Sequence, residues 1–282
     1  MKLLHIQALI IWFSAFISSF PVLADIKMGV FPRRSTAATN KIFKPLADEL
    51  SKALGEPVQL IIAKNFKYFW RGIEDNEYDL VHYNQYHYLL SHKNFGYKVI
   101  AVNEEFGNNK ISGSLIVRKD SGIKKVADLK GKTILFGGSE KAMGSYIAPI
   151  SILKKAGLLA GRDYTVSFSK NPPGAAIGVF NNAANAAGVG NVILKVKGVQ
   201  KKIDVSQMKV LAESKPFIQL PWAVNANMPT AKANKIQSFM TSLKGNNDAL
   251  LKSTRVTNFL KASDKDFNSV REIVKFSIDE RL

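Results

Sequence analysis

The chain has 282 residues, no cysteine, and 40 basic against 22 acidic side chains, a formal net charge of +18. Without cysteines it cannot form disulfides, so a packed core must hold the fold. The positive charge attracts anions, but it is scattered over pairs such as Lys124-Lys125 and Lys201-Lys202 instead of gathering in one arm, so nucleic-acid binding is not expected.

Residues 1–24 are typical of a secretory signal. They combine an early Lys2, an apolar run over 8–17 and small residues ending at Ala24. We expect cleavage after Ala24 and export of a soluble protein to the periplasm. The alternative, a membrane anchor, is disfavoured because the apolar run is short for a span. A lipid anchor is excluded because no Cys follows the cleavage site.

The first half of the mature chain alternates strands with helices. Short apolar runs predict strands at 26–31, 58–63, 79–83 and 98–103. Between the first two, Ser35 is placed to cap a helix that Gly55 ends, and Pro45 should kink that helix or delay its start. A second helix is predicted over 66–78. This alternation predicts crossover units and a mainly parallel sheet.

A second block begins near residue 112. Its predicted elements are strands at 112–118, 133–136, 164–169, 186–190 and 208–214, helices at 143–156 and 175–184, and a turn at 171–174. An apolar return at 217–225 and two helical segments, 229–245 and 264–281, complete the chain.

The stretch 78-YDLVHYNQYHYL-89 is rich in tyrosine and histidine. Alternation along its strand places His82 and Tyr83 on opposite faces. A tyrosine at a strand exit can offer its ring and hydroxyl to a ligand, so we expect Tyr83 to line a binding pocket, with Tyr86 and His82 beside it. The alternative is that the tyrosines only pack beneath the first helices.

The histidines do not predict a metal site. His82, His87 and His92 recur every five residues, a spacing that converges them on neither a helix nor a strand, and no HExxH pattern is present. We expect His87 and His92 to be surface or helix-face residues.

Three turns follow predicted strands and precede helices, at 32–36, 137–144 and 171–174. Helix N-termini present free N–H groups and a positive dipole end, so such turns favour an anion. In the first turn, Arg33 and Arg34 suit an oxyanion contact, unless both are simply solvated. Ser35 and Thr36 should cap the helix there while leaving its N–H groups available.

Five motifs occur in a characteristic order: PLADELSKALG, YDLVHYNQYHYL, VADLKGKTILFG, GSYIAPISILKKAGL and FIQLPWAV. In this the chain resembles the phosphate-, phosphite- and phosphonate-type periplasmic solute-binding proteins of ABC importers. The resemblance spans essentially the whole mature chain. It implies an α/β type II periplasmic binding protein fold, with mixed, mainly parallel sheets in two lobes joined by two crossover segments. The implied lobes are 25–111 plus 214–282, and 112–213.

The chain also departs from that family. Aligned on YIAP, the family's phosphoryl-binding Ser-Thr-Ser run is Ala142-Met143-Gly144, a frequent His is Pro172, and a common acidic residue is Leu220. Tyr83 matches the family's binding tyrosine. Other contacts could come from the altered turn, which contains Ser139, Glu140, Lys141, Gly144 and Ser145.

We expect a binding protein and not an enzyme. No serine, histidine and carboxylate arrangement, thiol or GxxxxGKS loop is present, and no cofactor or metal is expected. A monomer that captures a small oxyanion between two lobes for a membrane ABC permease is the favoured interpretation. The alternative is a periplasmic sensor that passes ligand occupancy to a membrane kinase or cyclase. The expected ligand-binding residues are Arg33, Arg34, Ser35, Thr36, His82, Tyr83, Tyr86, Ser139, Glu140, Lys141, Gly144 and Ser145.

Overall fold

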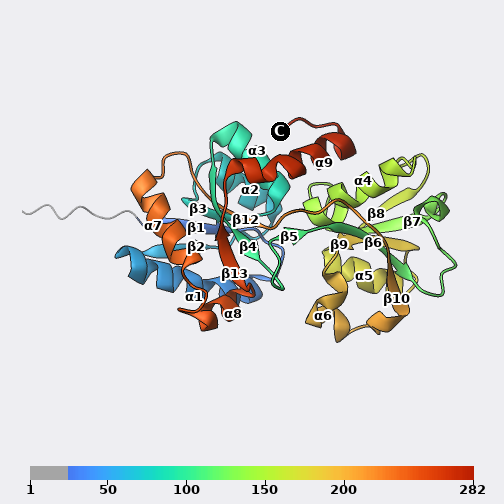
Figure 1. Ribbon diagram of the computed structural model, residues 1–282, viewed down its shortest axis with the longest axis horizontal. Helices are drawn as coiled ribbons and strands as arrows, with labels where there is room; N and C mark the ends of the chain where they lie inside the picture. The colour runs from blue at the N-terminus through green and yellow to red at the C-terminus, as the bar shows by residue number, and fades with distance from the viewer. Residues whose placement is uncertain (1–24) are drawn as a thin grey trace, which may run out of the picture.

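The computed structural model describes residues 25–282, so the expected signal peptide lies outside the described residues. The protein has two α/β lobes, and the chain passes from the first to the second and back again (Figure 1). Each lobe has a mixed sheet covered by helices. The predicted two-lobed α/β class is therefore confirmed.

The first lobe is built on a six-stranded sheet of order β13-β4-β12-β3-β1-β2. Its strands are β1 (Ile26–Val30), β2 (Val58–Ile61), β3 (Leu80–His82), β4 (Lys98–Glu104), β12 (Pro221–Val224) and β13 (Asn258–Lys261). Strand β1 pairs in parallel with β2 and β3, and the other three pairings are antiparallel. The edge strand β13 was not predicted.

The helices of the first lobe are α1 (Thr36–Leu54), α2 (Phe66–Glu74), α3 (Gln85–Phe95), α7 (Thr230–Thr241), α8 (Asp248–Thr254), η5 (Asp264–Phe267) and α9 (Asn268–Ile278). The predicted caps of α1 are confirmed: Ser35 accepts a hydrogen bond from the Ala38 N–H, and Gly55 ends the helix at a φ of 75°. Pro45 lies inside α1 without delaying its start.

The second lobe has a five-stranded sheet of order β10-β6-β9-β7-β8. Its elements are β6 (Gly113–Arg118), η1 (Val126–Leu129), β7 (Thr133–Gly137), η2 (Met143–Ile147), α4 (Ala148–Lys155), β8 (Thr165–Ser169), α5 (Pro172–Phe180), β9 (Ala186–Gly190), η3 (Ile193–Lys195), α6 (Lys197–Gln200), η4 (Val205–Gln207) and β10 (Met208–Glu213). Helix α5 begins at Pro172, inside the predicted turn, because Asn171 caps it and proline suits a first helical position.

Parallel pairs are not the majority. Four of the nine pairings in the two sheets are parallel and five are antiparallel. In the first lobe, the antiparallel pairs arise because β12 and β13, from the returning chain, run against their neighbours. The sheets are thus mixed, as predicted, but not mainly parallel.

The two crossing segments are hydrogen-bonded to each other. Strand β5 (Lys110–Ile111) pairs antiparallel with β11 (Phe217–Ile218). The N–H of Ser214 donates to the Gly113 carbonyl at 2.8 Å, and that of Gln219 donates to the Asn109 carbonyl at 2.9 Å. The lobes are therefore connected by one short ribbon.

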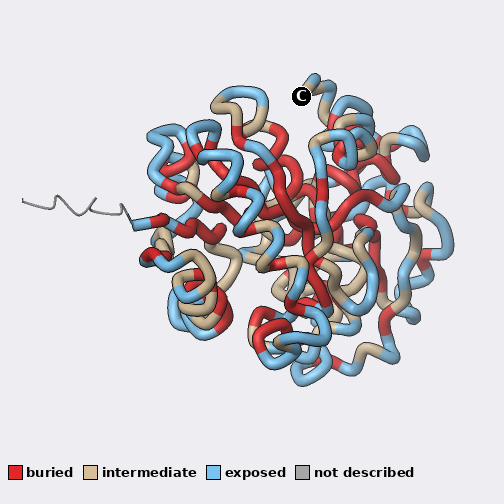
Figure 2. Tube along the Cα trace, turned by 60° about the vertical axis from the view of Figure 1, so that its left-hand side comes forward, coloured by how far each residue is buried: buried red, intermediate tan, exposed pale blue. Residues whose placement is uncertain are grey.

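Helix α9 contacts both lobes. It packs against α3 of the first lobe and α4 of the second, where the Lys154 ammonium lies 5.6 Å from the centre of the Phe276 ring. The largest apolar cluster likewise extends from the first lobe to Met143, Ile147 and Ala148 of the second. Buried residues run through the middle of the molecule (Figure 2). Among residues 25–282, no helix is long and apolar enough to cross a membrane.

Candidate functional site

One edge of the first lobe's sheet gathers the polar groups. Strands β1, β3 and β4 end there, and β12 and β13 begin there, because the last two run in the opposite direction. Helices α1 and α3 also start at this edge, directly after β1 and β3. Their N-termini contribute positive dipole ends, so the edge favours an anion.

Three arginines lie close together at this edge, around a single acidic group, Glu105. Arg33 contacts it, with 3.9 Å between the guanidinium nitrogen and a carboxylate oxygen. Burial lowers the pKa of Arg33, and the charge of Arg33 lowers the pKa of Arg34 to about 9, with Arg255 adding to both effects. The Nε of Arg33 is buried without a hydrogen-bond partner. Arg33 and Arg34 are half-buried and Arg255 is exposed, so two half-buried guanidinium groups and one exposed group share a single carboxylate, which favours a further anion.

His82 is fully buried beside this cluster. Its ring stacks on Trp222 with centres 4.5 Å apart and planes 14° apart, and its other neighbours are Phe31 and Phe43. Its Nδ1 lies 3.0 Å from the Pro221 carbonyl oxygen, whereas its Nε2 has no partner. Burial, with the charge of Arg33, lowers the pKa of His82 well below its usual value, so the ring is neutral.

Tyr83 lies on the opposite face of β3, under α3. It is fully buried, and its hydroxyl is hydrogen-bonded to that of Ser91 at 2.7 Å. The expected alternation of His82 and Tyr83 is present, but the turn that carries Arg33 and Arg34, here called the arginine turn, lies on the His82 side. In this structure Tyr83 therefore packs inside the first lobe. It does not line the sheet edge that carries Arg33, Arg34 and Arg255, which is called the arginine edge from here on.

Tyr86 also has a partner within the lobe. It is 6% exposed and its hydroxyl donates to the Glu280 carboxylate at 2.6 Å, which ties the C-terminal residues to α3. Burial raises the pKa of Tyr86, so the hydroxyl keeps its proton. Its polar atom is occupied in this arrangement.

The predicted residues of the second lobe lie in the turn after β7 (Ser139, Glu140 and Lys141) and in η2 (Gly144 and Ser145). Ser139, Glu140 and Lys141 are exposed, and Ser145 is buried with its hydroxyl donating to the Gly137 carbonyl. A Cβ added at Gly144 would meet open space. This turn contacts the first lobe, because the side-chain amide of Asn84, the N-cap of α3, donates to the Lys141 carbonyl at 3.1 Å.

His87 is buried at the same contact, so of the two expected positions the surface is wrong, and the residue lies on a buried face of α3. Its ring lies between those of Phe66 and Trp70, with ring-centre distances of 5.9 Å and 5.5 Å. Burial, with the nearby charge of Lys141, lowers the pKa of His87 to about 3. Its Nδ1 has no partner. Sequence periodicity missed this residue because burial here depends on α2 packing against α3.

The predicted set thus divides into three groups, one of which is formed by the second-lobe residues Ser139, Glu140, Lys141 and Gly144. Arg33, Arg34 and His82 lie close together at the strand-end edge, where Ser35 and Thr36 start α1. The side-chain hydroxyls of Tyr83, Tyr86 and Ser145 have partners inside the protein. Four residues were not predicted: Asn84, His87, Glu105 and Arg255. Two of these, Glu105 and Arg255, are 150 residues apart in sequence, and only the fold brings them together.

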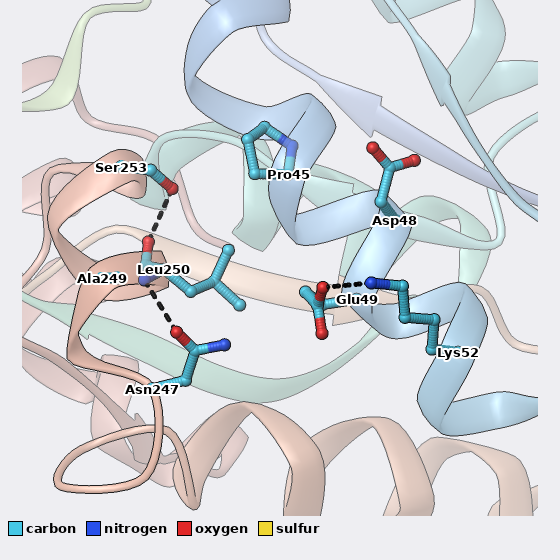
Figure 3. A pocket seen from close by; sticks show the side chains of 8 residues that line it. All are labelled: Pro45, Asp48, Glu49, Lys52, Asn247, Ala249, Leu250 and Ser253. Carbon is cyan, nitrogen blue, oxygen red and sulfur yellow. Dashed lines mark hydrogen bonds and ion pairs between the residues drawn. The ribbon is translucent and has the colours of Figure 1, made fainter.

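The pocket in Figure 3 lies elsewhere, between α1 and α8, and measures about 400 Å³. Its polar side chains are already engaged: Lys52 donates to Glu49, Asn247 accepts from the Leu250 N–H, and Ser253 donates to the Leu250 carbonyl. It therefore offers little for recognising a ligand. Within residues 25–282, no three His, Cys, Asp or Glu side chains are placed to hold a metal ion.

Solved structures with the same fold include several binding proteins. A binding component of an ABC phosphonate transporter from Pseudomonas aeruginosa matches with a TM-score of 0.77 and 18% identity, over 90% of this chain and 86% of that one. A Prochlorococcus marinus protein solved with methylphosphonate matches with a TM-score of 0.75 and 17% identity, over 88% and 96%. A Xanthomonas citri protein solved with ATP matches with a TM-score of 0.76 and 14% identity, over 90% and 97%.

The family assignment comes from the sequence itself. The model of the periplasmic substrate-binding protein of phosphonate ABC transporters matches residues 28–267, which is most of the chain. Members of this family bind a transporter's substrate and are not enzymes. The ordered motifs, the two lobes and the arginine edge agree with that role. The chain belongs to the family of phosphonate-type periplasmic substrate-binding proteins of ABC transporters.

Proposed function

We propose that the protein captures a phosphonate-class oxyanion between the arginine edge of the first lobe and the 139–145 turn of the second. The observation that carries this proposal is the cluster of Arg33, Arg34 and Arg255, which has one carboxylate, Glu105, to balance three positive charges. An oxyanion supplies the missing negative charge, and its oxygens accept hydrogen bonds from guanidinium and helix N–H groups.

The capture is reversible and needs no covalent step. Arg33 is held over the Phe31 ring, with its central carbon 5.0 Å from the ring centre, so its fork is positioned before the ligand arrives. The backbone N–H groups that begin α1 add donors beside it. Preorganised donors of this kind lower the entropy that is lost on binding.

In this proposal the two lobes close over the ligand. We assign them to residues 25–111 plus 214–282, and 112–213, with the β5–β11 ribbon as the hinge between them. The contact between Asn84 and the Lys141 carbonyl supports closure of the 139–145 turn over α3. A ligand that touches both lobes favours the closed form, which the permease then recognises. Binding of methylphosphonate by the Prochlorococcus marinus relative supports the ligand class.

The cellular part of the proposal follows the family. The mature protein starts near Asp25 after removal of residues 1–24, works in the periplasm as a monomer, and delivers its ligand to a membrane permease. Light scattering on the mature protein tests the monomer. N-terminal sequencing of the exported protein tests the cleavage site.

The ligand is tested by titration calorimetry of residues 25–282. Methylphosphonate, phosphite, phosphate and sulfate form the panel, with bound ligand first removed by partial unfolding and refolding. We expect heat with at least one phosphorus oxyanion and a strong loss in Arg33→Gln. Arg162→Gln, a change at an exposed arginine of the second lobe, is the matched control and should bind like the parent. Absence of heat with every member of the panel contradicts the proposal.

A further inference from the structure

The proton on the His82 ring has a fixed position. Its Nδ1 lies 3.0 Å from the carbonyl oxygen of Pro221. A carbonyl can only accept a hydrogen bond, so Nδ1 must carry the proton of the neutral ring. The other nitrogen, Nε2, is then a bare lone pair that can only accept.

This acceptor is isolated from water and cannot turn away. His82 has no exposed surface, and Nε2 has no donor among the described residues. The stack on Trp222 and the contacts with Phe31 and Phe43 hold the ring plane. An unpaired buried acceptor is destabilising, so the position favours any group that brings a donor to it.

A buried donor without a partner lies nearby. The Nε of Arg33 is also unpaired. The Arg33 guanidinium packs on the Phe31 ring, and the centre of that ring lies 5.2 Å from the centre of the His82 ring. A ligand that satisfies both positions must accept a hydrogen bond at one atom and donate one at another. A phosphonate that carries one proton does so, because it has both P–O⁻ and P–OH groups. A sulfonate of the same shape has only acceptors.

We propose that His82 recognises the proton of the bound oxyanion, so that the protein selects singly protonated phosphonates over sulfonates and over fully ionised phosphonates. This inference rests on the proposed function and adds to it the protonation state of the ligand and the residue that reads it. His82 acts by accepting the P–OH hydrogen bond at Nε2, while Arg33 donates to a P–O⁻ oxygen.

The surroundings of His82 allow a clear pH experiment. The charged groups that face it are Arg33 and Arg34, from the turn after β1. Helix α1 contributes Phe43 and strand β12 contributes Trp222, neither of which titrates. The His82 ring stays neutral because burial holds its pKa low. Arg34, with a pKa of about 9, stays mostly charged up to about pH 8.5, so a large change in affinity below that pH reports the ligand's proton.

Calorimetry of the mature protein with methylphosphonate and methanesulfonate tests the proposal between about pH 6 and pH 8.5, where a phosphoryl-type group loses its second proton. At the acid end, we expect methylphosphonate to bind at least about tenfold more tightly than methanesulfonate, a difference of about 1.4 kcal/mol. Its affinity should fall by up to about tenfold per pH unit at the alkaline end, and that of methanesulfonate should stay flat.

Two substitutions separate the nitrogens. His82→Asn can keep the donor to Pro221 but removes the distal acceptor, so it should lose the preference for methylphosphonate. His82→Gln places an amide oxygen near the Nε2 position and should retain part of the preference. His92→Asn, on α3 and hydrogen-bonded to the Tyr97 carbonyl, is the matched control and should leave the preference unchanged.

The outcomes are distinguishable. Equal wild-type affinity for both ligands overturns the proposal that His82 recognises the ligand's proton. The proposed oxyanion capture still stands in that case if Arg33→Gln abolishes binding of both ligands. A preference that persists in His82→Asn also overturns the proposal about His82, since the distal ring nitrogen is then not needed for the preference. Failure of the wild type to bind either anion removes the proposed function itself. If His82→Asn does not fold, the wild-type pH series alone decides.

Discussion

The two lobes contribute different chemistry to the place where they meet. The first lobe presents charged and ring side chains, Arg33, Arg34 and His82, whose polar atoms are incompletely paired. The second lobe presents residues 139–145, among which Gly144 has open space where a Cβ would stand and Ser145 hydrogen-bonds to its own lobe. We therefore expect side chains of the first lobe to set the charge of the ligand, and the second lobe to contribute mainly backbone groups.

Net charge gives the opposite impression. Residues 112–213 carry 16 basic against 6 acidic side chains, and the rest of the mature chain carries 23 against 16. The second lobe is thus the more positive, yet the described residues show no ion pair between any of its lysines and a carboxylate, and none of those lysines is buried. Those lysines are solvated surface. Positive charge locates a site only where it is buried and poorly compensated.

The largest expected effect separates the two lobes directly. Arg33→Gln should weaken oxyanion binding by about 100-fold, because a charge-assisted hydrogen bond is lost from a side chain that is only 31% exposed. Lys141→Gln, at the exposed turn of the second lobe, should weaken it by less than about threefold, because an exposed charge is screened by water. Calorimetry on both variants measures the ratio. Equal losses would break the assignment of charge recognition to the first lobe.

The next effect tests the backbone role of the second lobe. An added Cβ at Gly137 would lie 2.4 Å from the Cα of Pro172, so Gly137→Ala must push β7 and the start of α5 apart. We expect a loss of about 1–3 kcal/mol in the free energy of unfolding and weaker ligand binding. Gly198→Ala, where a Cβ meets nothing within 4 Å, is the control. Thermal unfolding with and without ligand measures both quantities, and unchanged affinity in a destabilised Gly137→Ala would argue against backbone contacts.

A smaller effect is expected from giving the second lobe a hydrogen-bonding side chain of its own. Gly144→Ser adds a hydroxyl where there is open space, and the φ of this glycine is not in the left-handed region. A new hydrogen bond to the ligand would raise affinity by up to about tenfold. Gly144→Ala separates the hydroxyl from the added Cβ. An increase shared by both variants would attribute the gain to helix stability.

The smallest effect on binding should come from Tyr83. Tyr83→Phe removes the hydrogen bond to Ser91 and should lower the free energy of unfolding by about 1 kcal/mol. Ligand affinity should change by less than about twofold, because the hydroxyl faces α3, away from the arginine edge. Denaturant unfolding and calorimetry check the two parts. A large loss of affinity would restore Tyr83 to the binding site.

Local signals in the sequence predicted much of the fold. Ser35 and Gly55 mark the ends of α1 because their side chain and backbone act within one helical turn. Strand β13 was missed because Asn258–Lys261 is short, half polar, and stable only as an edge against β4. Helix α8 was missed for a similar reason, since its seven residues are stabilised by packing on α1.

The candidate site was predicted where it depends on nearby residues. Arg33 and Arg34 follow directly from a strand end and a helix start. For β3, alternation correctly separated His82 from Tyr83, but it could not say which face the arginine turn covers, because this depends on where α1 and α3 lie. The convergence of Glu105 and Arg255 depends on the pairing of β4 with β13, which no local pattern encodes.

The turn that precedes the ribbon of β5 and β11 is a place where the molecule should tolerate a break. This turn exposes Phe106 (59%) and Gly107, both at positive φ, between Glu105 and Asn108. A protease that cuts this turn would leave two fragments which share a six-stranded sheet, since β4 on one fragment stays paired with β12 and β13 on the other. The nicked protein should therefore remain one particle, and the same point offers a natural place to divide the gene for a split reporter.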